Sequence, residues 1–282
     1  MEDLLPIDAR SIPPTFERVA DLTKQTTEAR FIGFPKDLVD TAPACRLDRL
    51  WLQNMKPEAA ARMAIRFDPA QLSLTNIQTA DLGWLSQLAR LRELLIEWNT
   101  KLESFGFLRE VRPLIRLRAD GLKRVNQLDD LESQPELKWL WIGGGIDRRL
   151  ELESLRPLSS LTELEKLFLV SIKLKDESLA PLASLQRLEQ LRLQSNVAPM
   201  EEYAHLAGAL PRVMDGVLRG FMTLRWNVPP QTDLLDVIDE IDGAEQVIMV
   251  GKGGRRFSVA KDRDKIIAQL RRFREIRDSV PR

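Results

Sequence analysis

Leucines recur at a fixed spacing in the segment LAPLASLQRLEQLRLQSN, residues 179–196. Steps of three lead from Leu179 to Leu191, and a step of two then reaches Leu193. A step of three keeps side chains on one edge of a 3₁₀ turn, whereas a step of two keeps them on one face of a β-strand. The segment therefore predicts a short helical turn followed by a short strand, with every leucine on the same side.

The same pattern recurs at the same phase along most of the chain. A single unit of this kind exposes too much apolar surface to be stable, so it needs copies of itself to pack against. The spacing predicts eight or nine stacked coils of about 20 to 30 residues each. The equivalent positions are Leu47, Leu91, Leu137, Leu164 and Leu188, and mixed aliphatics continue the phase from Leu235 to Met249. Pro69 with Leu72 and Leu74 fits a further copy between Leu47 and Leu91, although Ile65 and Phe67 compete for its strand.

The register is ambiguous in residues 102–118, where the steps of three change phase by one before Ile115 and Leu117. We expect Ile115 and Leu117 to point inward. The other register would bury Arg116 without a visible partner, and burying an unpaired charge is costly.

The repeated motifs resemble the leucine-rich repeat family. The strand motif LxxLxLxxN stands here as LEQLRLQSN (188–196) and LRELLIEWN (91–99), and the preceding PLxxLxxL as PLASLQRL and PLSSLTEL. The last position departs in LEKLFLVSI (164–172) and LKWLWIGGG (137–145). The second motif looks like that of the short-helix subtype of internalin-like and related bacterial intracellular repeats. The resemblance implies a right-handed α/β solenoid, with a concave parallel β-sheet and short 3₁₀ or α segments on the convex side.

Three regions are predicted from this organisation. Residues 1–37 form an N-terminal cap with a helix over 14–30, residues 38–250 form the solenoid, and residues 251–282 complete a C-terminal cap. Terminal coils need such caps because they would otherwise expose their interior edge. The C-terminal cap is predicted as a hairpin of residues 246–250 and 256–259 around GKGG, followed by a helix over 262–276. A separate helix is predicted between Met200 and Gly220.

Composition limits the environment and the partners. Forty-two basic and 42 acidic residues give a formal net charge of zero, so no global field points to nucleic acid. With Cys45 as the only cysteine, no intramolecular disulfide can form, which favours a reducing compartment. We find no apolar run long enough for a membrane span and no secretory signal at the start, so we expect a cytoplasmic protein. A secreted effector stays an alternative.

Alternate side chains of each strand are expected on the concave wall, because neighbouring residues of a strand point to opposite sides. These positions are Arg49, Trp51, Gln53, Gln71, Ser73, Thr75, Glu93, Leu95, Glu97, Leu114, Arg116, Arg118, Trp139, Trp141, Gly143, Lys166, Phe168, Val170, Gln190, Arg192, Gln194, Phe221, Thr223 and Arg225.

Aromatic and arginine side chains on this wall have no role in solenoid packing, and the same residue types are enriched in interface hot spots. We therefore expect a site for one protein partner; the alternative is that the rings only cover one another. The expected binding residues are Trp51, Arg116, Arg118, Trp139, Trp141, Lys166, Phe168 and Arg192. Replacing both Trp139 and Trp141 by alanine should cost ~2 kcal/mol of affinity and leave the fold intact.

The remaining tryptophans and the strand-end asparagines are assigned structural places. Trp84 is expected in the core on the convex side, and Trp98 and Trp226 are expected to fold inward. In the family that the motifs resemble, the asparagine after the strand bonds backbone groups of the following turn. The resemblance thus implies a structural role for Asn99, Asn196 and Asn227.

Catalysis finds little support, and we predict no enzyme activity, no cofactor and no metal. His205 is the only histidine and lies in a predicted helix, while Cys45 has no histidine near it in the sequence. A zinc site would need several cysteine or histidine ligands. Glu93 and Glu97 align on one strand as a possible acid–base pair, but attraction of basic groups on a partner is the simpler interpretation.

A charge asymmetry near the C-terminus suggests a second kind of binding surface. An acidic stretch, 233–245, precedes a segment with eight basic residues: Lys252, Arg255, Arg256, Lys261, Arg271, Arg272, Arg274 and Arg277. This basic cap is a candidate surface for RNA or anionic lipid, against the simpler interpretation of a solvated helix balanced by its acidic neighbour. An inhibitor or immunity protein, or a secreted effector, would instead bind its target through the concave wall.

Overall fold

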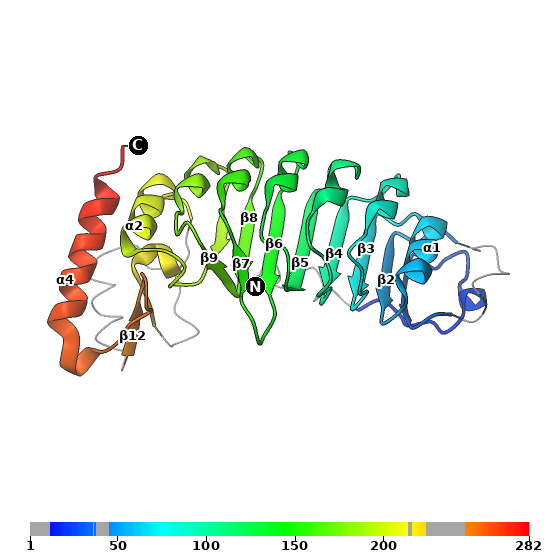
Figure 1. The fold of residues 1–282 in the computed structure, drawn as a ribbon, viewed down its shortest axis with the longest axis horizontal. Coiled ribbons are helices and arrows are strands. Elements are labelled where there is room, and N and C mark those ends of the chain that lie inside the picture. Colours follow the sequence, from blue (N-terminus) through cyan, green and yellow to red (C-terminus); the bar gives the residue numbers. More distant parts are fainter. Residues whose placement is uncertain (1–11, 36, 38–44, 214–215, 224–245, 282) are drawn as a thin grey trace.

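An eight-stranded parallel sheet runs along the long axis of the molecule in the computed structural model (Figure 1). The structure describes residues 12–35, 37, 45–213, 216–223 and 246–281. The strands follow one another in chain order without a crossover, β1-β2-β3-β4-β5-β6-β8-β10. This order is that of a solenoid, in which each coil adds one strand beside the previous one.

The elements are short and regular. The strands of the large sheet are β1 (Glu28–Ile32), β2 (Arg49–Gln53), β3 (Gln71–Thr75), β4 (Glu93–Glu97), β5 (Arg116–Leu122), β6 (Trp139–Gly144), β8 (Lys166–Val170) and β10 (Gln190–Arg192). The remaining strands are β7 (Leu150–Leu152), β9 (Ile172–Leu174), β11 (Phe221–Thr223), β12 (Gln246–Met249) and β13 (Arg256–Ser258). The α-helices are α1 (Pro57–Phe67), α2 (Met200–Ala209) and α4 (Val259–Asp278). The 3₁₀ turns are η3 (Val19–Asp21), η4 (Gly83–Gln87), η5 (Gly106–Arg109), η6 (Asp129–Ser133), η7 (Arg156–Ser160), η8 (Ala180–Ser184) and η9 (Gly216–Arg219).

The strand register places equivalent leucines side by side. Leu94 pairs with Leu117, Leu117 with Leu140, and Leu140 with Leu167, and the row ends at Leu191. Each of these side chains is at most 2% exposed, and all belong to one core that extends through the described coils. The predicted continuous aliphatic interior is confirmed. Burying each such leucine contributes roughly 1.5 to 3 kcal/mol, which is why the coils are stable only as a stack.

The 3₁₀ turns lie along one edge of the solenoid, above the strands in Figure 1. Within η7 the amide of Leu158 donates to the carbonyl of Leu155, and η8 repeats this bond between Leu182 and Leu179. The three-residue leucine spacing thus forms the turns that it predicted. One coil differs, because α1 replaces the 3₁₀ turn before β3. Ala59, Ala60, Ala64 and Met63 bury one face of this helix against the core.

A buried glutamine ties two neighbouring coils together. The side chain of Gln134, at the end of η6, is 0% exposed. Its Oε1 accepts from the amide of Leu114 at 2.7 Å, and its Nε2 donates to the carbonyl of Leu108 at 2.8 Å. Both backbone groups belong to the preceding coil. The amide of Leu114 is paired by Gln134, and the carbonyl of Leu108 also accepts from the amide of Val111 at 3.3 Å.

Replacing Gln134 with leucine keeps the volume but leaves the amide of Leu114 buried without its partner and removes one of the bonds to the carbonyl of Leu108. We expect the free energy of unfolding to fall by about 1.5 kcal/mol in urea titration. Gln127→Leu, on the exposed end of the same segment, is the matched control and should leave stability unchanged. Equal stabilities of the two variants would contradict this role.

The N-terminal region does not form the predicted helix over 14–30. Thr15 pairs with Arg30 in a parallel bridge, η3 is a single turn, and Glu28–Ile32 is the first strand of the sheet. Three threonines, Thr23, Thr26 and Thr27, occupy the centre of this segment, and β-branched residues lose side-chain freedom in a helix. The parallel sheet therefore begins before residue 38, inside the predicted cap.

The C-terminal region confirms the predicted hairpin and helix and adds a third strand. β12 and β13 pair antiparallel around the glycine turn, and α4 follows directly. β11 pairs antiparallel with β12, so Phe221 is buried in this small sheet, and the prediction that it faces the concave wall is wrong. Val247 and Met249 likewise belong to the antiparallel sheet rather than to a repeat strand. The residues predicted to complete that repeat, 235–244, lie outside the described residues.

The register in residues 102–118 also differs from the prediction. Leu114 is 0% exposed and lies in the core, whereas Ile115 is only half-buried. The steps of three therefore continue without a phase change from Leu102 to Leu117, and a step of two within β5 then reaches the buried Ala119. Arg116 faces away from the core in this register too, so the cost of burying it does not distinguish the two registers.

Two short strands that the spacing did not predict, β7 and β9, pair in parallel beside the large sheet. Leu150, Leu152, Ile172 and Leu174 supply their buried side. In the part of the chain that the structure describes, no helix is both long and apolar enough to cross a membrane.

Candidate protein-binding face

The sheet has one face that turns away from the leucine core, and we call it the open sheet face. Its side chains align in rows across the strands, because the parallel register adds no stagger between neighbours. The central row, in order across the sheet, is Arg30, Trp51, Ser73, Leu95, Arg118, Trp141, Phe168 and Arg192. This face corresponds to the wall predicted as concave.

Three rings pack together on the open sheet face and form the aromatic cluster: Trp139, Trp141 and Phe168. The ring of Trp141 stacks on that of Phe168 at 5.2 Å between centroids, and the ring of Trp139 lies 5.5 Å from Phe168 and 6.2 Å from Trp141. Leu95 completes the buried part, which is separate from the leucine core, and Val170 packs against it. β6 and β8 position the rings as neighbours because they pair residue by residue.

A buried arginine fixes the cluster on the β5 side. The guanidinium carbon of Arg118 lies 4.7 Å from the ring centroid of Trp141, a cation–π contact. One guanidinium nitrogen lies 3.2 Å from carboxylate oxygens of both Glu97 and Asp120. Because Arg118 is only 7% exposed, it orients Trp141 and balances two carboxylates rather than offering its charge to a partner.

The predicted site residues therefore divide by exposure. Trp139 is 9% exposed and Phe168 is 7% exposed, so these rings mainly support the cluster. Trp141 and Lys166 are half-buried, and Arg192 is exposed next to Phe168. The interpretation that the rings cover one another holds for Trp139 and Phe168, and Trp141 is the ring that stays accessible.

Two of the predicted residues lie apart from the cluster or engage a neighbour. Arg116 stands beside Trp139 and lies 3.7 Å from Glu93, so part of its charge is compensated. Trp51 lies in β2, four strands from β6, which is roughly 19 Å at the usual strand spacing. The structure does not bring Trp51 to the aromatic cluster.

Trp98 is a functional candidate that the sequence reasoning placed wrongly. We expected it to fold inward, but its side chain is 60% exposed. Its backbone is left-handed, with φ of 56°, and the equivalent positions are Gly33, Asn54 and Asn76 after β1, β2 and β3, and Gly121 near the end of β5. The amide of Trp98 donates to Asp120, as the amide of Asn76 does to Glu97 one coil earlier.

A left-handed backbone costs roughly 1 to 2 kcal/mol for most residues and is tolerated best by glycine and asparagine. Trp98 is therefore strained and exposed at once. Its ring lies over Gly121, where an added Cβ would approach the ring to 2.4 Å. Strain of this kind is concentrated at functional sites, and the spacing of left-handed positions is a signal in the sequence that would have predicted an exposed Trp98.

The other tryptophans and the strand-end asparagines were predicted to have structural roles, and the structure confirms only some of these predictions. Trp84 is half-buried and packs against the core from the turn side. Asn99 has its predicted structural role, since its side chain donates to the carbonyl of Thr79 at 2.8 Å and accepts from the Thr79 amide. Asn196 instead lines a pocket at the end of the sheet. Trp226 and Asn227 lie outside the described residues.

The possible catalytic groups are not brought together. Cys45 stands before β2 and His205 lies in α2, at opposite ends of the described solenoid. Partial burial raises the pKa of the Cys45 thiol, which lowers its thiolate fraction at neutral pH. Glu93 and Glu97 both face the open side but pair with Arg116 and Arg118. Among the described residues, no group of three potential ligands is placed to hold a metal.

The basic residues near the C-terminus are partly neutralised. Lys252 pairs with Glu177 of the solenoid, Arg272 lies 2.6 Å from Glu201 of α2, and Arg277 lies 2.8 Å from Asp278. α4 packs along α2 at the end of the solenoid (Figure 1). These contacts favour the capping role over an open polyanion-binding surface.

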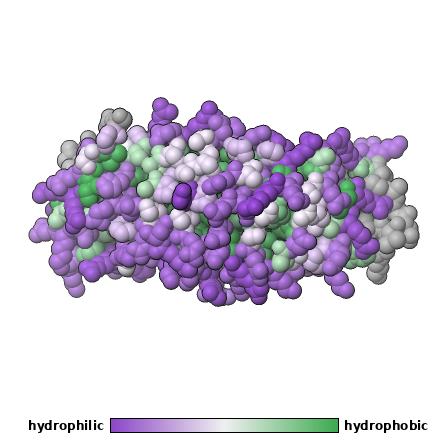
Figure 2. Space-filling model, turned by 45° about the horizontal axis from the view of Figure 1, so that its top comes forward, coloured by the Kyte–Doolittle hydropathy of each residue, from purple (hydrophilic) through white to green (hydrophobic). Residues whose placement is uncertain are grey.

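Figure 2 shows the molecule with the turn side brought forward. Hydrophilic residues make up most of that face, and hydrophobic residues appear in separate small groups among them (Figure 2). The open sheet face is the better candidate for recognition, because it carries the aromatic cluster with the half-buried Trp141 next to basic side chains.

Among known proteins, only solved structures give matches to this chain. No protein-family model matches the chain, and no curated protein matches it. Among solved structures, it is similar to internalin InlF of Listeria monocytogenes (17% identity, 66% of each chain, TM-score 0.43) and to internalin C2 of the same organism (19% identity, 56% of this chain and 64% of the other, TM-score 0.41). The plant peptide hormone receptor RGFR1, solved in complex with RGF2, matches at 18% identity over 68% of this chain and 36% of the receptor chain, with a TM-score of 0.46.

The chain therefore spans less than two thirds of the length of these structures. Similarity at this level concerns only the fold. The repeat geometry of the chain itself, with one leucine-lined strand added per coil, defines it as a leucine-rich repeat solenoid of the α/β class.

Proposed function

We propose that this chain is a non-enzymatic protein-binding module that holds one partner on the open sheet face. The observation behind the proposal is the aromatic cluster, which stands outside the leucine core and leaves Trp141 half-buried, with Lys166 on the next strand and Arg192 on the strand after that. Aromatic rings next to basic groups are typical of interface hot spots. A leucine-rich repeat solenoid is an established class of protein-interaction scaffold, which makes this function the simplest one for the fold.

Preorganisation is the proposed mechanism. Arg118 holds the ring of Trp141 from one side and Phe168 stacks on the other, so the ring is fixed before a partner arrives. A fixed anchor loses little side-chain entropy on binding, and that saving increases affinity. Stacked coils add a rigid backbone beneath the anchor.

Affinity capture from the native cell tests the proposal. Wild type and Trp141→Ala are immobilised side by side, with Ile65→Ala on α1 as the control for loss of an exposed apolar side chain elsewhere. The proposal requires a protein that is retained by wild type and by Ile65→Ala but lost with Trp141→Ala. Equal retention by all three would refute it. The identity of the captured protein separates an inhibitor from an effector, since both would use this face.

Trp98 is proposed as a second contact at the rim of the same face. If it is kept for binding, then asparagine, which suits a left-handed backbone, should relieve strain. We expect Trp98→Asn to raise the free energy of unfolding by about 1 kcal/mol and to weaken partner binding. Thermal unfolding and affinity capture measure the two effects.

Asn76→Leu is the matched control for the Trp98 substitution. It puts a branched side chain at the equivalent left-handed position and removes a 2.8 Å bond to Asn54, so it should destabilise the chain. A Trp98→Asn variant as unstable as Asn76→Leu would mean that Trp98 is retained for packing on Gly121.

A cytoplasmic location is part of the proposal. A single cysteine that is partly buried fits a reducing, cytoplasmic environment, where structural disulfides are rare.

A further inference from the structure

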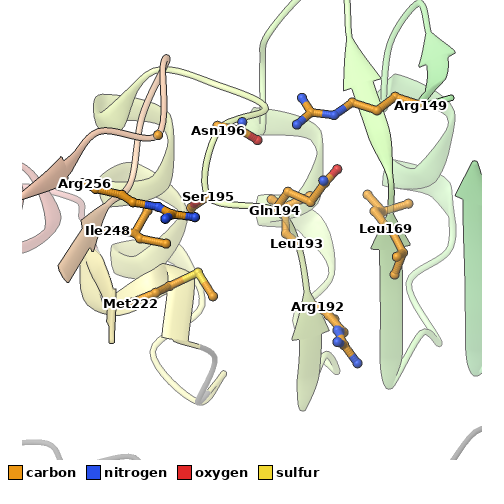
Figure 3. A pocket seen from close by; sticks show the side chains of 12 residues that line it. Arg149, Leu169, Arg192, Leu193, Gln194, Ser195, Asn196, Met222, Ile248 and Arg256 are labelled. Atoms are coloured by element: carbon orange, nitrogen blue, oxygen red, sulfur yellow. The ribbon is translucent and has the colours of Figure 1, made fainter. Parts of the chain in front are cut away.

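A pocket of about 400 Å³ lies where the large sheet meets the C-terminal antiparallel sheet (Figure 3). β8 and β10 form one wall, β11, β12 and β13 form the other, and residues 194–196 lie between them. Arg149, Arg192 and Arg256 line it, and among the described lining residues none is acidic.

The arginines of this pocket differ from those of the open sheet face. On that face Arg49 pairs with Glu28, and Arg116 and Arg118 pair with glutamates of β4. Within the described part of the chain, Arg149, Arg192 and Arg256 have no such ion pair, and all three are exposed. Among the described residues, the pocket therefore combines three positive charges with no carboxylate in its lining, which favours an anionic ligand.

The positions of the three arginines favour an extended ligand over a small anion. In Figure 3, Arg149 and Arg256 approach residues 194–196 from opposite sides, and the side chain of Arg192 points away from both of them. A single phosphate would be held by guanidinium groups that meet at one point. Separate groups suit several carboxylates spaced along a chain, each able to receive a bidentate arginine contact.

The rest of the lining fits a peptide. Met222 and Ile248 provide accessible apolar surface between the arginines, backed by the buried Leu169 and Leu193, and Gln194 and Asn196 offer amide groups. An apolar side chain next to a carboxylate would contact both kinds of surface at once. Nucleic acid, whose phosphates lack such neighbours, fits this lining less well.

The pocket floor is held in place by a buried tyrosine. The hydroxyl of Tyr203 donates to the carbonyl of Gln194 at 2.5 Å and accepts from the amide of Val197 at 3.1 Å. Gly251 of the hairpin turn donates to the carbonyl of Ser195 at 2.8 Å, which joins the two walls. Burial raises the pKa of Tyr203 far above its usual range, so it remains a hydrogen-bond donor at any physiological pH.

We infer that this pocket binds an acidic segment of the protein partner, with glutamate or aspartate side chains alternating with apolar ones. The pocket is continuous with the aromatic cluster, since Val170 borders both and Arg192 stands next to Phe168. The inference rests on the proposed function in taking the ligand to be a protein segment. It adds the charge and pattern that this segment must have.

Fluorescence anisotropy with the full chain tests the pocket without the partner. The probes are a fluorescein-labelled peptide of alternating leucine and glutamate and its leucine–glutamine counterpart. The acidic peptide should bind and the neutral one should not, and binding should weaken as NaCl is raised because the contacts are electrostatic. Equal binding of the two peptides would overturn the inference.

Substitutions locate the binding. Arg149→Gln and Arg256→Gln, both on exposed side chains, should each weaken binding of the acidic peptide about fivefold or more. Arg212→Gln removes the same charge from an exposed position outside the pocket and should change it less than about twofold. An equal loss of peptide affinity in all three variants would mean that the peptide is attracted by the overall charge, and it would contradict the inference.

Inorganic phosphate separates the sources of negative charge. If phosphate displaces the acidic peptide at concentrations similar to those of unlabelled peptide, the pocket is a phosphate site and the peptide assignment is wrong. This result does not decide the proposed function. That proposal is tested by whether Trp141→Ala loses the captured partner, and Trp141 does not line the pocket.

Discussion

Trp141→Ala is expected to weaken partner binding by about 30-fold, equivalent to ~2 kcal/mol. The ring is the accessible member of the aromatic cluster and is held between Phe168 and Arg118, so its removal deletes both contact area and a preorganised anchor. Removing it also leaves the guanidinium of Arg118 without its cation–π contact. Titration calorimetry with the captured partner measures the effect.

Ile65→Ala serves as the control in the same titration, because it removes an exposed aliphatic side chain from α1 on another part of the molecule. Its affinity should equal that of wild type. A change below about twofold for Trp141→Ala, with a folded protein, would exclude the aromatic cluster as the centre of the interface.

Trp139→Ala is expected to lower the free energy of unfolding by about 3 kcal/mol. Trp139 is 9% exposed and packs against Phe168, Trp141 and Leu95, so its removal leaves a hole in the cluster that spans three strands. Urea unfolding followed by far-UV circular dichroism measures the loss.

Trp141→Ala provides the comparison, because the more exposed ring should cost clearly less stability when removed. Equal, small losses in both variants would contradict the supporting role of Trp139. Its burial also revises our expectation that the double alanine variant leaves the fold intact. The single substitution at Trp141 is therefore the cleaner probe of binding.

The leucine periodicity predicted most of the solenoid because it is a local signal. Each coil repeats the same turn and strand, so the spacing around Leu164 and Leu188 specifies both the element and its buried face. Packing between coils then follows from the shared phase. The same reasoning placed Trp141 and Phe168 on the open sheet face, because strand alternation decides which side a residue faces.

The predictions that were wrong concern features that depend on long-range contacts or on backbone geometry. β11 pairs with β12 across more than 20 residues of sequence, and no local pattern in Phe221 identifies that partner. The exposure of Trp98 follows from a left-handed turn that asparagine or glycine occupies in neighbouring coils. The burial of Arg118 depends on carboxylates from β4 and β5 that come together only in the folded register.

The pocket between the two sheets was outside the reach of sequence reasoning for the same reason. Arg192 was predicted as a wall residue, but Arg149 and Arg256 come from a loop and a hairpin that are far apart in the chain. Only the packing of the C-terminal sheet at the end of the solenoid brings the three arginines around one space.

Hydroxyl-radical footprinting of the purified complex tests the central claim most directly. The account predicts that the partner protects Trp141 and the exposed side chains near it, while Trp84 and Ile65 on the turn side react as in the free chain. Protection of Trp84 and Ile65 with an unchanged Trp141 would place the partner on the other side of the solenoid and contradict the account.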